Sequence, residues 1–364
     1  MNIVFRTDAS NEIGTGHVMR CLTLADELKK CGAKCIFVCR QYQGNLLSLI
    51  INRGHKALGL PDCHDIRAQT DGEPSHASWL GCDWVTDVNQ TNEVLGDILV
   101  GWFIVDHYAI DHQWESVMRS RASHIMVIDD LADRHHECDI LLDQNWFAVN
   151  DHDRYQGYVS EQCLSLLGPK YALLGPEYSY IRSLMPPRDG LVHRILVFMG
   201  GSDPTNETYK VLTALQAKEL SHLSVDVVFG SNYSNIEDIK LKLVQRPNTS
   251  MHHNLRSLAG LMMKSDLMIS AGGATSWERM CLGLPAIVIS IASNQTLTNV
   301  ALSEAGYIKF LGEKEKVNSK DIEKNIIYSI MHNKLLKDQS IRMQKLVDGK
   351  GSLTVANYLI NYSH

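Results

Sequence analysis

Polar and titratable side chains gather in one short stretch near the start of the chain, residues 6–21. The residues there that could bind a ligand or take part in catalysis are Arg6, Asp8, Ser10, Gly14, Gly16, His17 and Arg20. The two glycines let backbone pass close to a ligand, and a plain connection between elements needs none of the charged groups. We therefore predict that this stretch carries chemistry. The alternative is an ordinary glycine turn followed by a packed or solvated histidine.

The flanking residues indicate where this stretch lies in the fold. An apolar run at residues 3–5 precedes it, and residues 18–30 follow with apolar positions at helical spacing. The stretch is thus predicted to be the loop between a first strand and a first helix, with His17 near the helix N-terminus. In an open α/β sheet this is the rim where ligands bind.

Length and composition set limits on the class of protein. The chain has 364 residues, 45% of them hydrophobic and 21% charged, which predicts a globular protein of about two domains. A net charge of −6 without any basic run argues against a nucleic-acid partner or an anionic membrane surface. No signal peptide and no apolar stretch long enough to span a membrane is apparent, so we expect a cytoplasmic protein.

Cysteine and histidine usage favours neither a disulfide framework nor a metal site. The nine cysteines include no C-x-x-C pair, and several lie inside apolar segments such as residues 35–39, as expected of small core residues in a reducing compartment. The 16 histidines are scattered. We expect no metal and no cofactor.

Short apolar runs alternate with amphipathic segments along most of the chain. The runs predicted to be strands include residues 35–39, 102–106, 124–130, 140–142, 195–199, 225–229, 267–270 and 286–289. This alternation predicts an α/β protein with mostly parallel, doubly wound sheets. A stretch interrupted by Gly-Pro and Pro-Pro pairs divides it into two tandem Rossmann-like domains with a cleft between them. The predicted limits are 1–165 for the first domain, 166–192 for a linker, 193–345 for the second domain and 346–364 for a last helix that packs back across the domains.

Two predicted strands of the first domain end in polar clusters. One cluster is Asp106, His107 and Tyr108, and the other is Asp129 with Asp130. Strand ends on the rim of the opening loop would bring these groups toward His17. The alternative is that each aspartate caps the following helix or turn.

Two glycine turns in the second half predict a diphosphate site. Each follows a predicted strand and opens a helix, so that backbone N–H groups can bind phosphate oxygens. Neither is a Walker loop or a dinucleotide fingerprint. The residues of these turns are Gly200, Gly201, Ser202 and Asp203 in the first, and Gly272, Gly273, Ala274 and Thr275 in the second.

Three polar residues near the second turn are candidates for further nucleotide contacts. Glu278 lies one helical turn beyond Thr275, where a carboxylate could accept hydrogen bonds from a ribose diol. Asn294 and Gln295 follow the next strand and could bind a sugar or phosphate through their amides. The alternatives are a solvated helix glutamate and a helix N-cap.

With these residues in place, the chain resembles the UDP-2,4-diacetamido-2,4,6-trideoxy-β-L-altropyranose hydrolases of pseudaminic acid biosynthesis. The resemblance spans nearly the whole chain, and the opening motif is specific to that group. The second-half turns are shared with GT-B glycosyltransferases. The residues that carry the resemblance are Arg6, Asp8, Ser10, Ile13, Gly14, Gly16, His17, Arg20, Cys21, Asp106, His107, Tyr108, Gly200, Gly201, Ser202, Asp203, Pro204, Gly272, Gly273, Ala274, Asn294 and Gln295.

The resemblance implies a GT-B fold, UDP held by the second domain and metal-free hydrolysis with inversion at the anomeric carbon. By matching positions it implies that His17 is the base that activates water and that Tyr108 lines the sugar site. Asp8 and Arg20 would orient His17 or the substrate, and Arg6, Gly14 and Gly16 would line the substrate site. A GT-B chain needs no partner to complete its site, so we expect a monomer with a small-molecule UDP-sugar as its partner.

Two other functions stay open at this stage. A glycosyltransferase on the same fold would use a UDP-amino sugar donor and would need an acceptor site in the first domain. A non-catalytic sensor of nucleotide sugars is disfavoured by the polar cluster around His17. No sugar contact is predicted from residues 61–100.

Overall fold

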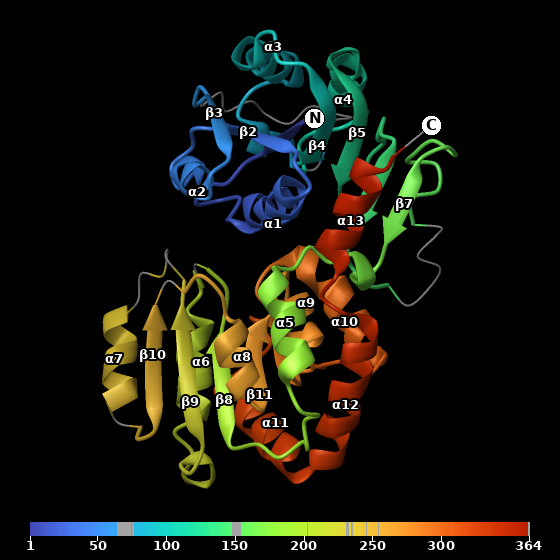
Figure 1. Ribbon diagram of the computed structural model, residues 1–364. Helices are drawn as coiled ribbons and strands as arrows, with labels where there is room; N and C mark the ends of the chain where they lie inside the picture. Colours follow the sequence, from blue (N-terminus) through green and yellow to red (C-terminus); the bar gives the residue numbers. More distant parts are fainter. Residues whose placement is uncertain are drawn as a thin grey trace. The chain divides into compact units, whose positions relative to one another are not determined.

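A computed structural model of the protein describes residues 1–63, 74, 76–147, 154–201, 203–230, 233, 236–244, 246–253 and 255–362. The chain forms two compact units (Figure 1). Unit 1 comprises Met1–Asn145, Val149–Leu173 and Lys350–His364, and unit 2 comprises Trp146–Ala148 and Leu174–Gly349. The range 166–192, predicted to be a linker, contains the end of a strand, a 3₁₀ turn and a helix.

Unit 1 is built on a seven-stranded parallel sheet with helices on both faces. Parallel strands are buried on both faces, which is why the first strand carries Ile3, Val4 and Phe5 in succession, all fully buried. In spatial order the strands are β3 (Lys56–Leu60), β2 (Lys34–Arg40), β1 (Asn2–Thr7), β4 (Val100–Asp106), β5 (Ala122–Ile128), β6 (Ile140–Asp143) and β7 (Leu164–Leu167). Its helices are α1 (Gly16–Lys30), α2 (Leu47–Asn52), α3 (Trp84–Leu95), α4 (His112–Met118) and α13 (Gly351–Ile360), with 3₁₀ turns η1 (Ala77–Leu80), η2 (Arg119–Arg121) and η4 (Pro169–Tyr171).

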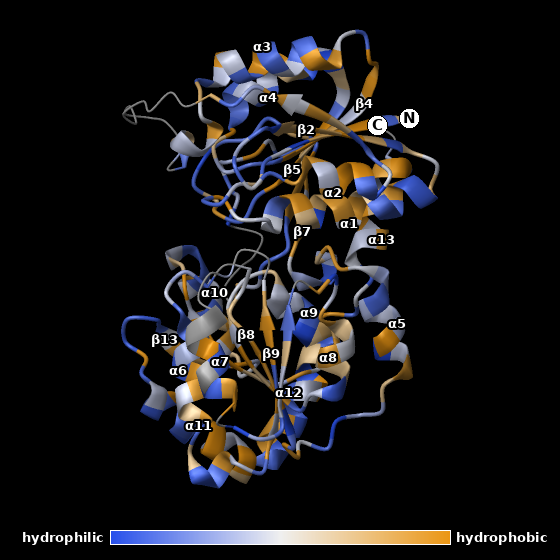
Figure 2. Ribbon diagram, turned by 90° about the vertical axis from the view of Figure 1, so that its left-hand side faces the viewer, coloured by the Kyte–Doolittle hydropathy of each residue, from blue (hydrophilic) through white to orange (hydrophobic). Residues whose placement is uncertain are grey.

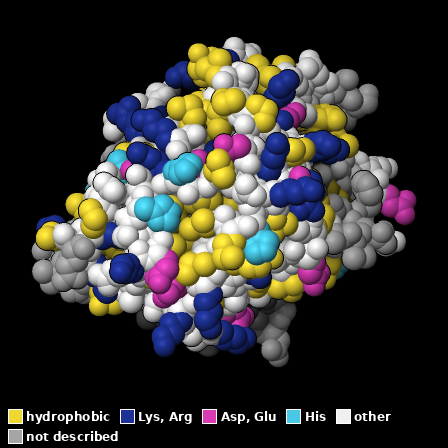
Figure 3. Space-filling model, turned by 90° about the horizontal axis from the view of Figure 1, so that it is seen from below, with side chains coloured by type: hydrophobic (Ala, Val, Ile, Leu, Met, Phe, Trp, Pro, Cys, Tyr) yellow, Lys and Arg dark blue, Asp and Glu magenta, His cyan; other side chains and the backbone are white. Residues whose placement is uncertain are grey.

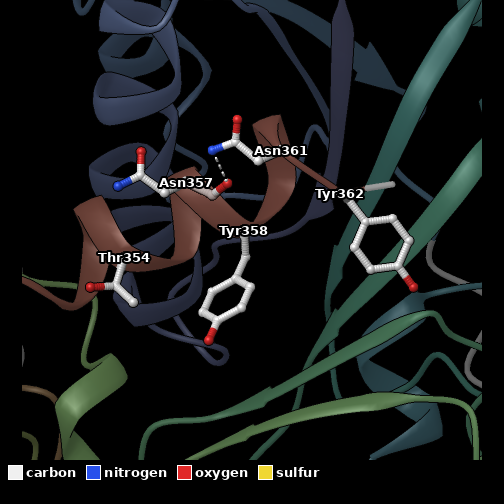
Figure 4. Close-up of a pocket in the computed structure, with 5 residues that line it drawn as sticks. All are labelled: Thr354, Asn357, Tyr358, Asn361 and Tyr362. Atoms are coloured by element: carbon white, nitrogen blue, oxygen red, sulfur yellow. Dashed lines mark hydrogen bonds between the residues drawn. The ribbon is translucent and has the colours of Figure 1, made fainter. Parts of the chain in front are cut away.

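The last helix of the chain belongs to unit 1. Helix α13 packs against α1, and its residues Val355, Ala356 and Leu359 join the apolar core beneath the sheet. The indole N–H of Trp102 on β4 donates to the carbonyl of Leu359 over 3.2 Å. The outer side of α13 lines a cavity of about 470 Å³ with Thr354, Asn357, Tyr358, Asn361 and Tyr362 (Figure 4).

Unit 2 repeats the same architecture with six parallel strands. Figure 2 shows apolar colouring on β8 and β9 and mixed colouring on the surrounding helices, the pattern of a buried sheet under amphipathic helices. In spatial order the strands are β10 (Thr249–His253), β9 (Ser224–Phe229), β8 (Arg194–Phe198), β11 (Leu267–Ala271), β12 (Ala286–Ser290) and β13 (Lys309–Glu313). Its helices are α5 (Pro176–Leu184), α6 (Glu207–Ala214), α7 (Ile236–Val244), α8 (Ala259–Lys264), α9 (Thr275–Cys281), α10 (Thr296–Glu304), α11 (Ser319–Met331) and α12 (Asn333–Leu346), with 3₁₀ turns η5 (Lys218–Leu220) and η6 (Ser293–Gln295).

The predicted fold class, two doubly wound α/β sheets, is confirmed. The strands that the sequence pattern did not identify are β3, β7, β10 and β13, which are the edges of the two sheets. An edge strand has one neighbour and a solvent-exposed side, so its residues are less uniformly apolar, as in Thr249–His253. Helix α6 ends at Ala214 and is followed by the 3₁₀ turn η5.

The surface and the helices of the described residues add two observations. On the face shown in Figure 3, Lys and Arg are interspersed with Asp and Glu rather than gathered into one patch. Among the parts of the chain that the structure describes, none of the helices has both the length and the apolar character required to cross a lipid bilayer.

Candidate active site

The opening stretch is the loop between β1 and α1, as predicted. The hydroxyl of Ser10 accepts hydrogen bonds from the amides of Glu12 and Ile13, at 3.1 and 2.9 Å. Gly14 then adopts a left-handed conformation with φ of +80°, which a side chain would strain. This turn ends at Gly16 and makes His17 the second residue of α1.

His17 is held by a carboxylate from the end of β4. Its Nδ1 lies 2.6 Å from Oδ1 of Asp106, which is fully buried. A carboxylate can only accept, so Nδ1 carries the hydrogen and Nε2 holds the lone pair when the ring is neutral. His17 is 8% exposed, so the ring that Asp106 holds in place is not fully closed off from solvent.

Arg20 holds the same carboxylate from one helical turn further on. Its Nε donates to Oδ2 of Asp106 and its Nη2 donates to Oδ1, both over 2.7 Å, while Nη1 lies 3.1 Å from Asp130. The thiol of Cys21 also donates to Oδ2, over 3.4 Å. Burial alone would raise the pKa of Asp106, but the charges of Arg20 and His17 and their hydrogen bonds hold it far below its ordinary value. Asp106 is therefore a permanent anion beside the imidazole.

Tyr108 packs its ring edge-on to His17, with 4.6 Å between the ring centroids. Trp79 of η1 stacks near it at 5.6 Å, and His76 lies 5.2 Å away. Burial, followed by the charge of Asp130, raises the pKa of Tyr108, so the phenol stays protonated. Tyr108 is thus brought to His17, as the sequence predicted for the strand end that contains it.

Arg6 and Asp8 belong to a second network, which is sealed from solvent. Arg6 pairs with Asp8 over 2.8 Å and donates two hydrogen bonds to Asp87 of α3, over 3.1 and 2.7 Å. Arg40 of β2 also binds Asp87, over 2.6 Å. The side chains of all four residues are fully buried.

The remaining contacts of Asp8 are with the neighbouring strands. Its Oδ1 accepts the backbone N–H of Arg40 over 2.6 Å, and its Oδ2 lies 3.2 Å from Nε2 of His107. Burial would raise the pKa of Asp8, yet Arg6 and His107 hold it far below its ordinary value. Of the two residues predicted to orient His17 or the substrate, Arg20 lies at His17, with its Nη2 3.3 Å from Nδ1. Asp8 instead belongs to the sealed network, and the carboxylate that contacts Nδ1 is Asp106.

The two glycine turns of unit 2 follow β8 and β11, as predicted. Gly200 has φ of +91° and Gly273 has φ of +126°, so both positions favour glycine. Gly230, which follows β9, lies directly against the backbone of Gly201, and a side chain there would overlap it. The side chain of Gln295 lies over Gly273, 3.7 Å from where a side chain at that position would begin. The ends of three strands therefore meet around exposed backbone.

Several predicted nucleotide contacts have structural partners of their own. The two carboxylate oxygens of Asp203 accept the first amides of α6, from Glu207 and Thr208 at 2.8 and 2.9 Å, so Asp203 acts as a helix cap. Gln295 accepts the amide of Ile291 over 3.2 Å, and Asn294 is exposed. Ser202 lies outside the described residues.

Helix α9 begins at Thr275, directly after Ala274, and carries Glu278 in its first turn. Burial raises the pKa of Glu278 to about 7, although a hydrogen bond with Tyr178 of α5 lowers it. The side chain is partly exposed. An ionised Glu278 carboxylate can accept hydrogen bonds, and its contact with a ribose stays a prediction.

A metal site has no support in the described ranges, where His, Cys, Asp and Glu form no group of three able to hold an ion. Sequence analysis expected Asp106 near His17 but gave it no role of its own, because its contact with Nδ1 depends on the parallel register of β1 and β4. Sequence analysis did not identify Asp87, which fixes Arg6 and Arg40. Asp87 lies inside α3, 81 residues from Arg6, and no local pattern marks it.

Two doubly wound α/β units in tandem, each built on a parallel sheet, are the architecture of the GT-B fold. MurG of Acinetobacter baumannii has this fold, with a TM-score of 0.66 at 12% identity over 99% of each chain. Residues 195–350, within unit 2 and its junction with α13, match the glycosyltransferase family 28 C-terminal domain.

Proteins with related sequences show which members of this fold the chain resembles. The UDP-2,4-diacetamido-2,4,6-trideoxy-β-L-altropyranose hydrolase of Campylobacter jejuni is 24% identical over 84% of this chain and 98% of its own length, which confirms the predicted resemblance. The spore coat polysaccharide biosynthesis protein SpsG of Bacillus subtilis is 29% identical over 57% of this chain, and protein MJ1062 of Methanocaldococcus jannaschii is 27% identical over 79%. The chain spans 61% and 55% of the lengths of these last two relatives.

Proposed function

We propose that this protein hydrolyses UDP-2,4-diacetamido-2,4,6-trideoxy-β-L-altropyranose to UDP and the free sugar, in pseudaminic acid biosynthesis. The observation that carries the proposal is the 2.6 Å contact between Nδ1 of His17 and the buried Asp106. It leaves Nε2 as a base on a ring that is fixed in orientation. The Campylobacter jejuni relative is named for this reaction.

In the proposed reaction, His17 removes a proton from water as the water oxygen bonds to the anomeric carbon. The bond between that carbon and the diphosphate oxygen breaks, and UDP leaves with the electron pair. A single displacement inverts the anomeric centre. The charge of Asp106 stabilises the imidazolium that forms, and Arg20 fixes the carboxylate in turn.

Unit 2 is proposed to bind UDP. The backbone around Gly201 and Gly273 is exposed, and amides at such turns suit diphosphate oxygens. Glu278 would accept the ribose hydroxyls. A diphosphate stabilised in this way needs little protonation to leave, so a single base is sufficient for the reaction.

A His17→Asn variant tests the role of the base. We expect kcat to fall by about 10²–10⁴-fold, since an amide cannot accept the proton from water, while the Kd for UDP stays unchanged. His135→Asn, at an exposed histidine, is the matched control and should retain full activity. Full hydrolytic activity in the His17 variant would contradict the proposed role.

A glycosyltransferase that uses a UDP-amino sugar donor is the second candidate. The family 28 C-terminal domain and the likeness to MurG favour it. A transferase would release UDP slowly until an acceptor is added, whereas a hydrolase would release it at full rate in buffer alone.

A further inference from the structure

Two thiols outside the proposed reaction lie side by side at the start of β6 and β7. The Sγ atoms of Cys138 and Cys163 are 3.6 Å apart. The two strands pair in parallel, with Ile140 opposite Leu164, and the amide of Leu164 donates to the carbonyl of Asp139 over 2.9 Å. An S–S bond is about 2.0 Å long, so each sulfur would have to move by only about 0.8 Å.

The two thiols differ in access to solvent. Cys138 is 6% exposed, whereas Cys163 is partly exposed. The hydrogen bond with Cys163, followed by burial, raises the pKa of the Cys138 thiol. A dissolved oxidant therefore meets Cys163 first, and Cys138 lies behind it at bonding range.

Aromatic and charged side chains lie near the pair, and Cys163 is partly exposed. Tyr362, which follows α13, packs against Trp102 and His124, with 5.1 and 5.0 Å between ring centroids, and both thiols lie close enough to affect its pKa. Arg119 pairs with Asp139, the residue between Cys138 and β6, over 2.6 Å.

We propose that Cys138 and Cys163 are a reversible disulfide-forming site that reacts with small disulfides such as oxidised glutathione. The Cys163 thiolate attacks one sulfur of the oxidant and expels one glutathione thiolate. The Cys138 thiolate then attacks Sγ of Cys163 and expels the second. Two protein thiols lose two electrons and two protons, and one glutathione disulfide becomes two glutathione thiols.

The disulfide would close the connection between β6 and β7. That connection carries Tyr155, whose hydroxyl lies 3.0 Å from Oδ2 of Asp129 and 3.1 Å from Oδ2 of Asp143. A closed loop loses less conformational entropy on folding, so the oxidised protein should melt roughly 5 °C higher than the reduced protein.

Peptide mass mapping after treatment of the full chain with oxidised glutathione tests the site. We expect a linked peptide pair containing Cys138 and Cys163 as the main product, lost again on reduction, with the rise in melting temperature. A Cys31→Ser control, at an exposed cysteine, should leave this product unchanged.

Single variants separate the two steps. Cys138→Ser should stop at a stable mixed disulfide between glutathione and Cys163, and Cys163→Ser should leave the buried Cys138 unmodified. Circular dichroism verifies that each variant is folded. A wild-type protein that keeps both thiols free, or that stops at the mixed disulfide on Cys163, would overturn the proposal.

Discussion

Two ionic networks lie at the same rim of the unit 1 sheet, and they differ in access to solvent. The Asp106 network ends in His17 and Arg20, which are 8% and 9% exposed. The network of Arg6, Asp8 and Asp87 is fully buried. Both combine arginine, aspartate and histidine side chains, so residue type does not distinguish them. A network that keeps one edge open can act on a ligand, whereas a sealed network can only fix the fold.

Two adjacent residues at the end of β4 belong to different networks. Asp106 contacts His17 and Arg20, while His107, the next residue, contacts Asp8. Successive residues of an extended chain point in opposite directions, so neighbours in the sequence serve different networks. We infer that the first network performs chemistry and that the second holds β1, β2, β4 and α3 together.

Removal of Asp87 should have the largest effect on stability. Asp87→Ala would leave Arg6 and Arg40 buried without this shared anion, and breaking a buried ion pair costs about 3–5 kcal/mol. Denaturant unfolding measures the loss, with the exposed Asp97→Ala as control. A loss below about 1 kcal/mol would show that the sealed network does not hold the fold.

Asp106→Asn should instead act mainly on the reaction. The amide can present a donor to Nδ1 of His17 and so disturb the tautomer that leaves Nε2 free, which we expect to lower kcat by about 10²–10³-fold. The Kd for UDP should not change. An unchanged kcat in a folded variant would remove Asp106 from the mechanism.

Glu278 in unit 2 provides a pH test of a partly open carboxyl. Its pKa of about 7 lies above the ordinary value, so the folded state retains the proton that the unfolded state releases between about pH 4.5 and 7. Stability from this group is therefore present below about pH 4.5 and lost as the pH rises to 7. Glu278→Gln should be more stable than the wild type at pH 8, by roughly 1–3 kcal/mol, and equally stable at pH 4.

The same substitution tests nucleotide binding. If ionised Glu278 accepts the ribose hydroxyls, wild-type affinity for UDP should fall as the pH drops below 7, and the Gln variant should lose most of that dependence. Glu304→Gln, at an exposed glutamate, is the control. Calorimetric titration across this pH range measures both effects. Parallel pH profiles for the two variants would contradict the assignment.

Arg20→Lys should have the smallest effect. A lysine retains the charge but cannot bind both oxygens of Asp106 and also reach Asp130, so we expect kcat to fall about 10-fold. Arg53→Lys, in the more exposed pair with Asp26, is the control and should behave like the wild type. Steady-state kinetics distinguish this result from a larger loss, which would place Arg20 in contact with substrate.

The sequence predicted the local parts of this molecule better than the long-range ones. Central strands, the opening loop and both glycine turns follow from apolar runs and glycine positions, which are local signals. The roles of Arg6 and Asp8 could not be read in this way. They depend on Asp87, a helix residue 81 positions along the chain from Arg6. They also depend on the opposite directions in which the side chains of residues 106 and 107 point.

The same limit applies to unit 2. The turn at Gly200–Gly201 was evident, but Gly230, which leaves room for it, follows another strand and has no pattern of its own. Asp203 looked like a ligand contact because a polar residue after a glycine turn serves either purpose, and its capping bonds to α6 appear only in the folded chain.

The most direct test of the central claim is hydrolysis of UDP-2,4-diacetamido-2,4,6-trideoxy-β-L-altropyranose in water labelled with heavy oxygen, followed by mass spectrometry and NMR of the first product. We expect the released sugar to carry solvent oxygen at an inverted anomeric carbon and to form at full rate without an acceptor. In His17→Asn the rate of this release should fall by about 10²–10⁴-fold. Retention of the anomeric configuration, release only after an acceptor is added, or incorporation of solvent oxygen into UDP instead of the sugar would contradict the proposed mechanism.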